Sequence, residues 1–338
     1  MQPLEHLPEQ ISRFVRASVV AEYATVSAAG VPIDTPTYHF PSPDLATLDL
    51  ATGLAYPVKA ERARRNPKVG LLIEGAPHEP VVSIAGHAAV RDADLQANAD
   101  RYLAETSYLL PGGGTWDIGK KAIWYWTRII VCVAPVAIRW WENAAAMEGP
   151  PTTWTALSTK PLPKSDPSPP GASSAPSEWA QRPWQELADR ALKRGGPGHI
   201  TVCDAAAYPL PIRAGEIRVS GDGFDCITPA GIPWQLAGQA TLTFAGVETF
   251  VGTVASIGGR VHFRVARTLP LHPLMEDPKE VFSPSVHTQE NLMRRLRHEA
   301  QRRNQPLPTL PEQLPEPTAG ARLRMGRLQL DVERPAKR

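Results

Sequence analysis

The chain has 338 residues, of which 42% are hydrophobic and 21% charged, and its 36 basic and 34 acidic residues leave a formal net charge of +2. This length suffices for two domains with separate cores, and the composition is typical of a soluble globular protein. The near balance of charge argues against a general nucleic-acid binder, and no apolar run approaches the roughly 20 residues that cross a bilayer.

The N-terminal residues and the cysteines indicate one cellular compartment. The first six residues lack the basic stretch followed by an apolar stretch that marks a secretory signal. Cys132, Cys203 and Cys226 are too few and too scattered for a disulfide framework or a zinc site. We therefore expect a cytoplasmic protein without a metal site and without a membrane or nucleic-acid partner.

The first segment predicts a small antiparallel barrel. Ile11, Phe14 and Val15 recur at the spacing of a helix, and short runs rich in β-branched residues follow. The runs expected to form strands cover residues 23–27, 33–40, 46–51, 69–74, 81–91 and 128–141. Two more helices are expected between these strands, at 57–65 and 93–105. Short antiparallel strands with a few outer helices favour a barrel.

A second segment repeats this pattern after a stretch rich in proline and serine. His199-Ile-Thr-Val-Cys-Asp204 is similar to Tyr23-Ala-Thr-Val-Ser-Ala28, and residues 238–244 are similar to 86–90. We interpret the similarity as a faint internal duplication, with chance similarity between β-rich segments as the alternative. A helix at 183–193 is expected to precede the second set of strands.

The proline clusters divide the chain into four parts. We expect a first barrel at 1–148, a linker or extended arm at 149–178, a second barrel at 179–275 and a C-terminal part at 276–338. The last part is expected to hold an arginine-rich helix at 286–303 and a proline-rich tail ending in a strand at 322–332.

A basic helix follows the third expected strand, which ends in Thr52-Gly53. Lys59 and Arg62 lie one helical turn apart on one face, where they could neutralise a phosphate that also accepts hydrogen bonds from Thr52. The alternative is a solvated basic helix face. We favour the anion site because Thr52-Gly53 precedes the helix and Asn66-Pro67 opens the next apolar run.

The order of strand, Thr52, Lys59, basic helix, Asn66-Pro67 and strand resembles the flavin-binding split barrels of the pyridoxamine 5'-phosphate oxidase-like superfamily. The resemblance covers residues 8–142 and, faintly, 198–275. It implies a mainly β (α+β) fold with two split β-barrel domains of the FMN-binding type. The barrels would pair within one chain or as a homodimer, with FMN at their interface.

The resemblance also implies which residues hold FMN. Its phosphate would be bound by Thr52 and Lys59 with the basic helix, and its ring would lie along residues 33–39. Trp141 could stack on the isoalloxazine of a partner site, with core packing as an equal alternative. The implied cofactor-binding residues are Asp34, Thr35, Pro36, Thr37, Thr52, Gly53, Lys59, Arg62 and Trp141.

An FMN-dependent oxidoreductase acting on a small organic substrate is the function that this resemblance implies. Pyridoxamine phosphate is not the expected substrate, because residues 81–86 lack the arginine with which the oxidase contacts the substrate phosphate. No catalytic acid or base is identified. The second barrel has no lysine or basic helix after Thr228-Pro-Ala-Gly231, so we expect it to be a degenerate partner.

Two alternatives remain open at this stage. The barrel could be a non-catalytic protein that binds or senses a flavin, a deazaflavin or haem, and haem would need an axial ligand. The histidines available for this are His39, His87, His199 and His262. The other alternative is a cofactor-free barrel whose proline-rich segments act as docking arms in a complex.

Overall fold

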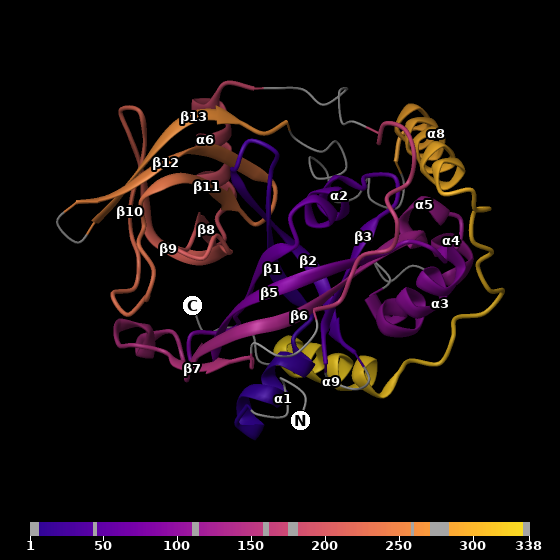
Figure 1. Ribbon diagram of the computed structural model, residues 1–338, viewed down its shortest axis with the longest axis horizontal. Coiled ribbons are helices and arrows are strands. Elements are labelled where there is room, and N and C mark those ends of the chain that lie inside the picture. Colours follow the sequence, from indigo (N-terminus) through magenta and orange to yellow (C-terminus); the bar gives the residue numbers. More distant parts are fainter. Residues whose placement is uncertain are drawn as a thin grey trace.

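Two antiparallel β-barrels lie side by side in the computed structural model, which describes residues 7–42, 46–109, 115–157, 162–174, 182–257, 260–270 and 284–333 (Figure 1). In the first barrel the strand order β3-β2-β1-β4-β5-β6 closes on itself because β3 pairs with β6. The strands are β1 (Val20–Val26), β2 (Pro32–Pro41), β3 (Leu48–Gly53), β4 (Lys68–Ile73), β5 (Val81–Arg91) and β6 (Arg128–Trp141).

The second barrel is closed in the order β10-β13-β12-β11-β8-β9. Its strands are β8 (Gly198–Cys203), β9 (Pro209–Ser220), β10 (Gly223–Ile227), β11 (Gly238–Phe244), β12 (Glu248–Ile257) and β13 (Arg260–Thr268). The mainly β fold with two barrel domains is thereby confirmed.

Both barrels have the same strand order. Read around the ring, β1-β2-β3-β6-β5-β4 corresponds to β8-β9-β10-β13-β12-β11. This matches the predicted similarity between residues 23–28 and 199–204, which belong to β1 and β8. The predicted match of 238–244 with 86–90 is wrong, because β11 occupies the place of β4 and not of β5.

Alternation along the strands builds each core. Leu48 and Leu50 of β3 and Val69 and Leu71 of β4 are fully buried inside the first barrel. The second core is aromatic, with the rings of Phe244, Phe250 and Phe263 between 4.8 and 6.4 Å from that of Phe224. The strand predictions for the first segment are therefore correct to within a few residues at their ends.

Short helices cover the first barrel. They are α1 (Glu9–Ala17), α2 (Val58–Arg65), α3 (Leu95–Thr106), α4 (Trp116–Gly119) and α5 (Ile123–Trp126), with the 3₁₀ helices η2 (Ser107–Leu109) and η4 (Ala145–Glu148). Helix α6 (Trp184–Arg194) packs on β12 and β13 of the second barrel. Among the helices in the described part of the chain, none is long and apolar enough to cross a membrane.

The C-terminal part returns to the first barrel. Leu292, Leu296 and Ala300 of α8 (Val286–Arg302) join its core, and Arg295 Nε donates to the Ala55 carbonyl over 2.9 Å. The strand expected at 322–332 is wrong, because these residues lie in helix α9 (Ala319–Glu333), beside α1 (Figure 1). Alternating arginine and apolar residues suggested a strand, but they are also good helix formers.

The proline-rich stretch is more ordered than a simple linker. Residues 152–155 form β7 (Thr152–Thr155), which pairs with β6. Farther on, the Asp166 carboxylate accepts hydrogen bonds from the backbone N–H groups of Asp92 and Ala93 at 2.8 and 3.0 Å. The predicted linker or extended arm thus contacts the first barrel at these residues, while 158–161 and 175–178 lie outside the described ranges. The predicted domain limits stay predictions.

Candidate functional site

The second barrel packs closely on the outer face of β1, β2 and β4. A Cβ atom on Gly70 of β4 would lie only 1.7 Å from the Pro209 carbonyl oxygen, and one on Gly246 would lie 2.2 Å from Pro36 Cδ. Backbones approach this closely only where a glycine leaves out the side chain. The interface between the barrels is therefore built for close contact.

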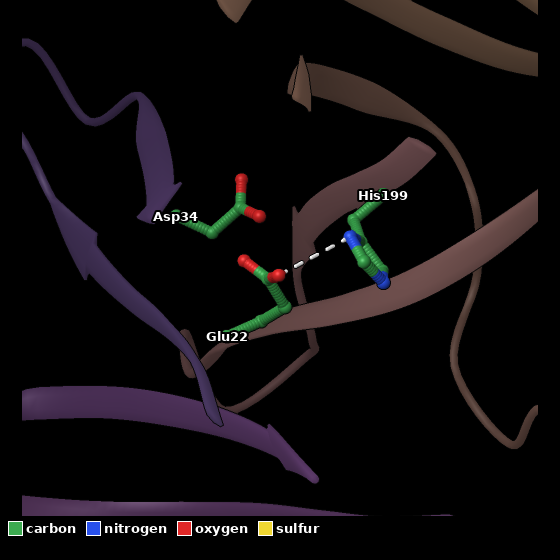
Figure 2. A group of neighbouring side chains, drawn as sticks. All are labelled: Glu22, Asp34 and His199. Carbon is green, nitrogen blue, oxygen red and sulfur yellow. Dashed lines mark ion pairs between the residues drawn. The ribbon is translucent and has the colours of Figure 1, made fainter. Parts of the chain in front are cut away.

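Charged and titratable residues meet at this interface, and three of them, Glu22, Asp34 and His199, are buried. Glu22 of β1, Asp34 of β2 and Glu74, just after β4, face His199 of β8 and Arg213 of β9. His199 Nε2 lies 2.9 Å from Glu74 Oε1, and His199 Nδ1 lies 3.5 Å from Glu22 Oε1. Figure 2 shows the side chains of Glu22, Asp34 and His199 pointing toward one another from strands of both barrels.

Burial and mutual repulsion disturb the titration of these groups. Burial raises the pKa of Glu22 to about 7, with the charges of Asp34 and Glu74 adding to it and that of His199 opposing it. Burial likewise raises the pKa of Asp34. Burial acts in the same direction on Glu74, but hydrogen bonds from His199 and Arg213 outweigh it and lower the pKa. Unpaired carboxylates are costly to bury, so this cluster favours a bound positive charge.

Helix α2 adds cations next to this cluster. Burial and the charges of Arg62 and Arg128 lower the pKa of Lys59 to about 8, while Glu22 and Asp34 raise it. Arg62 is already engaged, since its Nε donates to Thr25 Oγ1 over 2.8 Å. Two residues of this helix were predicted to bind phosphate. Arg62 is bound to Thr25, whereas Lys59 lies between the acidic cluster and the basic side chains.

Arg128, at the start of β6, lies on the outer face of the first barrel. The centre of its guanidinium group is 4.5 Å from the ring of Tyr102 and 4.3 Å from that of Tyr125, as in cation–π contacts. Its buried Nε has no hydrogen-bond partner among the described residues. Gly53 is paired with Arg128, and a Cβ there would lie 3.4 Å from Arg128 Nη1.

Thr52 and Gly53 lie on opposite faces of the barrel wall. Thr52 pairs with Ile129, a core residue. It follows Leu48 and Leu50 at every second position of the strand, so its side chain lies with theirs on the inner face of the barrel. Gly53 lies on the outer face with Arg128. The hydroxyl of Thr52 therefore points away from the surface on which Arg128 lies.

Two of the four predicted residues of β2, Asp34 and Pro36, lie under the second barrel. Asp34 Oδ1 accepts hydrogen bonds from Thr243 Oγ1 at 3.0 Å and from Thr241 Oγ1 at 3.3 Å. Pro36 contacts the turn at Gly246. Thr35 and Thr37 alternate with them and occupy the opposite face of the strand, where Thr37 Oγ1 donates to the Thr35 carbonyl at 3.3 Å. Their contact with a flavin ring stays a prediction.

Trp141 lies at the other end of β6 from Arg128. Thirteen residue steps along a strand span about 40 Å, so one cofactor cannot bridge the two side chains along that strand. Trp141 packs with Leu72, Val81 and Met147, and its Nε1 donates to the Gly149 carbonyl over 2.9 Å. The structure thus shows Trp141 in an apolar cluster, and stacking at a partner site stays a prediction.

Five residues of the site are not among the predicted cofactor-binding residues, namely Glu22, Glu74, Arg128, His199 and Arg213. Arg128 carried a signal, since it begins an apolar strand that ends in two tryptophans. His199 carried none, because its partners come from strands more than a hundred residues away. Of the histidines considered for haem, His39 binds the Val15 carbonyl at 3.2 Å, and His262 lies between Asp222 and Asp225.

Comparison with known proteins finds similarity of structure. The sequence matches no protein-family model and no curated protein. The chain is similar to a putative pyridoxamine 5'-phosphate oxidase from Listeria innocua (19% identity, 40% of this chain and 98% of that one, TM-score 0.31). It is also similar to an F420 reductase (17% identity, 39% and 98%, TM-score 0.32).

A third similar structure is a pyridoxamine 5'-phosphate oxidase-related, FMN-binding protein from Nostoc punctiforme (12% identity, 45% and 98%, TM-score 0.31). The three similar structures cover 39 to 45% of this chain.

Proposed function

We propose that this chain binds FMN, or a related deazaflavin, on the outer face of its first barrel, with the phosphate held by Lys59 and Arg128. The observation that supports this most is the buried Arg128 Nε, which lacks a hydrogen-bond acceptor beside Gly53. An unsatisfied buried donor on a charged group is costly, and an anion in front of it would supply the missing acceptor.

The chemistry of the surrounding residues fits a phosphorylated ring compound. Lys59 and Arg128 supply positive charge, and guanidinium groups are well suited to phosphate. Tyr102 and Tyr125 supply aromatic rings beside Arg128. Gly53 has no side chain, so the space next to the Arg128 guanidinium group is open on that side. Thr52 is left out of this phosphate site, because its hydroxyl faces the barrel interior.

A bound flavin would supply hydride transfer, so the proposed activity is oxidation or reduction of a small organic substrate. The protein residues would orient the cofactor and shield one side of it. Tyr102 of α3 is buried and Tyr125 of α5 is half-buried, and both would restrict the access of water there. No side chain of this site needs to donate or accept a proton for hydride transfer.

An absorbance titration with FMN tests the proposal, using riboflavin as a probe that lacks the phosphate. We expect wild-type protein to bind FMN more tightly than riboflavin. Arg128→Ala and Lys59→Ala should each weaken FMN binding about 10- to 100-fold, the size of a lost hydrogen bond to a charged group, and leave riboflavin binding nearly unchanged.

Arg218→Ala is the matched control, because Arg218 is an exposed arginine on the second barrel, 3.9 Å from Glu216. It should bind FMN like wild type. The proposal fails if wild-type protein binds no flavin, or if it binds FMN and riboflavin equally. A haem spectrum of the purified protein would instead favour the haem-binding alternative.

A further inference from the structure

One imidazole and two carboxylates converge between the barrels, on Glu22, Asp34 and His199. One ligand atom of each lies within 4.8 Å of those of the others. All three side chains are buried, with His199 1% and Asp34 0% exposed. Figure 2 shows them directed into one common space. The sequence predicted no metal site, because these residues have no ligand spacing along the chain.

His199 and Asp34 are each held at one polar atom and have a second polar atom without a hydrogen-bond partner. Glu74 Oε1 accepts hydrogen bonds from Arg213 and lies 2.9 Å from His199 Nε2, so this nitrogen donates to Glu74. The other nitrogen, Nδ1, then faces the cluster and has no hydrogen-bond partner there. Asp34 is fixed at Oδ1 by Thr241 and Thr243.

The remaining oxygen atoms are unsatisfied as well. Asp34 Oδ2 and Glu22 Oε2 are buried without a hydrogen-bond partner among the described residues. One ligand atom of each of the three residues thus lies close to those of the others, and Asp34 and His199 are held in place by hydrogen bonds at their other polar atoms. A histidine oriented by a carboxylate on its far nitrogen is the usual arrangement at protein metal sites.

We propose that Glu22, Asp34 and His199 bind a divalent transition-metal ion such as Zn²⁺ at the barrel interface. The ligands would be His199 Nδ1 and one carboxylate oxygen each from Glu22 and Asp34. Imidazole nitrogen and carboxylate oxygen together suit zinc and its first-row neighbours better than calcium or magnesium. Three protein ligands leave a position for water or another ligand.

The observed spacing suits such an ion. Bonds of about 2.0 to 2.1 Å in tetrahedral geometry put two ligand atoms about 3.3 Å apart. His199 Nδ1 and Glu22 Oε1 are 3.5 Å apart. The ligand atom of Asp34 lies within 4.8 Å of the other two and would have to move closer to bind the ion. The ion would neutralise the acidic groups that the two barrels bury together.

This site is separate from the proposed phosphate site, which uses Arg128 and Lys59. The charge of Lys59 interacts with Glu22 and Asp34, and Arg213 is bound to Glu74. Metal binding is therefore tested with metal ions and variants of Glu22 and His199, and flavin binding with FMN and variants of Lys59 and Arg128.

The test starts with protein treated with a chelator and then titrated with Co²⁺, followed by visible absorption, and with Zn²⁺ by calorimetry. We expect one ion per chain, and Zn²⁺ should displace Co²⁺ and remove its bands. Glu22→Gln and His199→Ala should weaken Zn²⁺ binding by more than about 100-fold, since even residues that only support a ligand cost 10- to 100-fold.

His262→Ala is the matched control. His262 also lies beside two aspartates, but its two nitrogens bind Asp225 at 2.7 Å and Asp222 at 2.9 Å, so none is free. This variant should keep the single site. The proposal is overturned if wild-type protein takes up no Co²⁺ at one equivalent, or if Glu22→Gln binds Zn²⁺ like wild type. The wild-type titration decides even where His199→Ala does not fold.

Discussion

The two barrels share a strand order and differ in what connects the strands. Between β3 and β4 the first barrel inserts helix α2 with Lys59 and Arg62. The equivalent connection between β10 and β11, residues 228–237, contains no helix and no lysine or arginine. Between β5 and β6 the first barrel inserts α3, α4 and α5, which contribute Tyr102 and Tyr125.

The difference indicates that the barrel is a scaffold, and that the features suited to a cofactor lie in the segments that connect the strands of the first barrel. The second copy contributes in another way. Through β8, β9 and β11 it places His199, Arg213 and Thr243 against acidic residues on β1, on β2 and just after β4. One barrel thus carries the proposed phosphate site, and the contact between both creates the buried polar cluster.

Separating the two barrels should have the largest effect. In Gly70→Val the new side chain would meet the Pro209 carbonyl, because even a Cβ lies 1.7 Å from it. We expect the free energy of unfolding to fall by about 3 kcal/mol, as in severe overpacking, measured by urea denaturation.

Gly221→Val is the control for the change of residue type, since a Cβ at Gly221 has no atom within 4 Å. If both variants unfold at the same urea concentration, close packing between the barrels does not contribute to stability.

The basic helix that only the first barrel has should make FMN binding depend on pH. The pKa of Lys59 is lowered to about 8 by burial and its basic neighbours, so the side chain loses its charge above that pH. The phosphate is already a dianion there, because its second pKa is near 6. FMN affinity should therefore fall by up to about tenfold per pH unit above pH 8, measured by absorbance titration between pH 7.5 and 9.5.

Lys59→Arg keeps its charge over this range and should show an affinity that is nearly constant. An equally steep decline in this variant would assign the titration to another group.

The smallest predicted effect concerns helix α3, which the second barrel lacks. Asp94 is its N-cap and accepts a hydrogen bond from the Ala97 N–H over 2.9 Å. Asp94→Ala should lower the free energy of unfolding by about 1 kcal/mol, while Asp94→Asn, which also caps helices well, should cost less. Urea denaturation compares the two, and equal losses would show that the cap contributes nothing.

The strands could be predicted from the sequence because alternation reports one buried face. The predicted ranges 81–91 and 128–141 coincide with β5 and β6. Strand β7 was missed because its four residues, which follow two prolines, are too few to show an alternation of apolar and polar residues. The strand pairs with β6. Helix α9 was mistaken for a strand because arginine and apolar residues alternate in it, and one of its buried residues is an arginine, Arg324, bound to Glu105.

The site could be predicted only where its residues are close in the sequence. Lys59 was found because it follows Thr52-Gly53 on a short basic helix. The position of Arg128 between two tyrosines depends on helices packing over β6, and the partners of His199 depend on one barrel docking on the other. Contacts of this kind come from tertiary structure and leave no spacing in one sequence.

A crystal structure of the chain soaked with FMN would test the central claim most directly. The account predicts one FMN per chain, with its phosphate between Lys59 Nζ and the Arg128 guanidinium group, and none beside residues 228–237 of the second barrel. A phosphate bound by the second barrel, or FMN held without contact to Lys59 and Arg128, would contradict it.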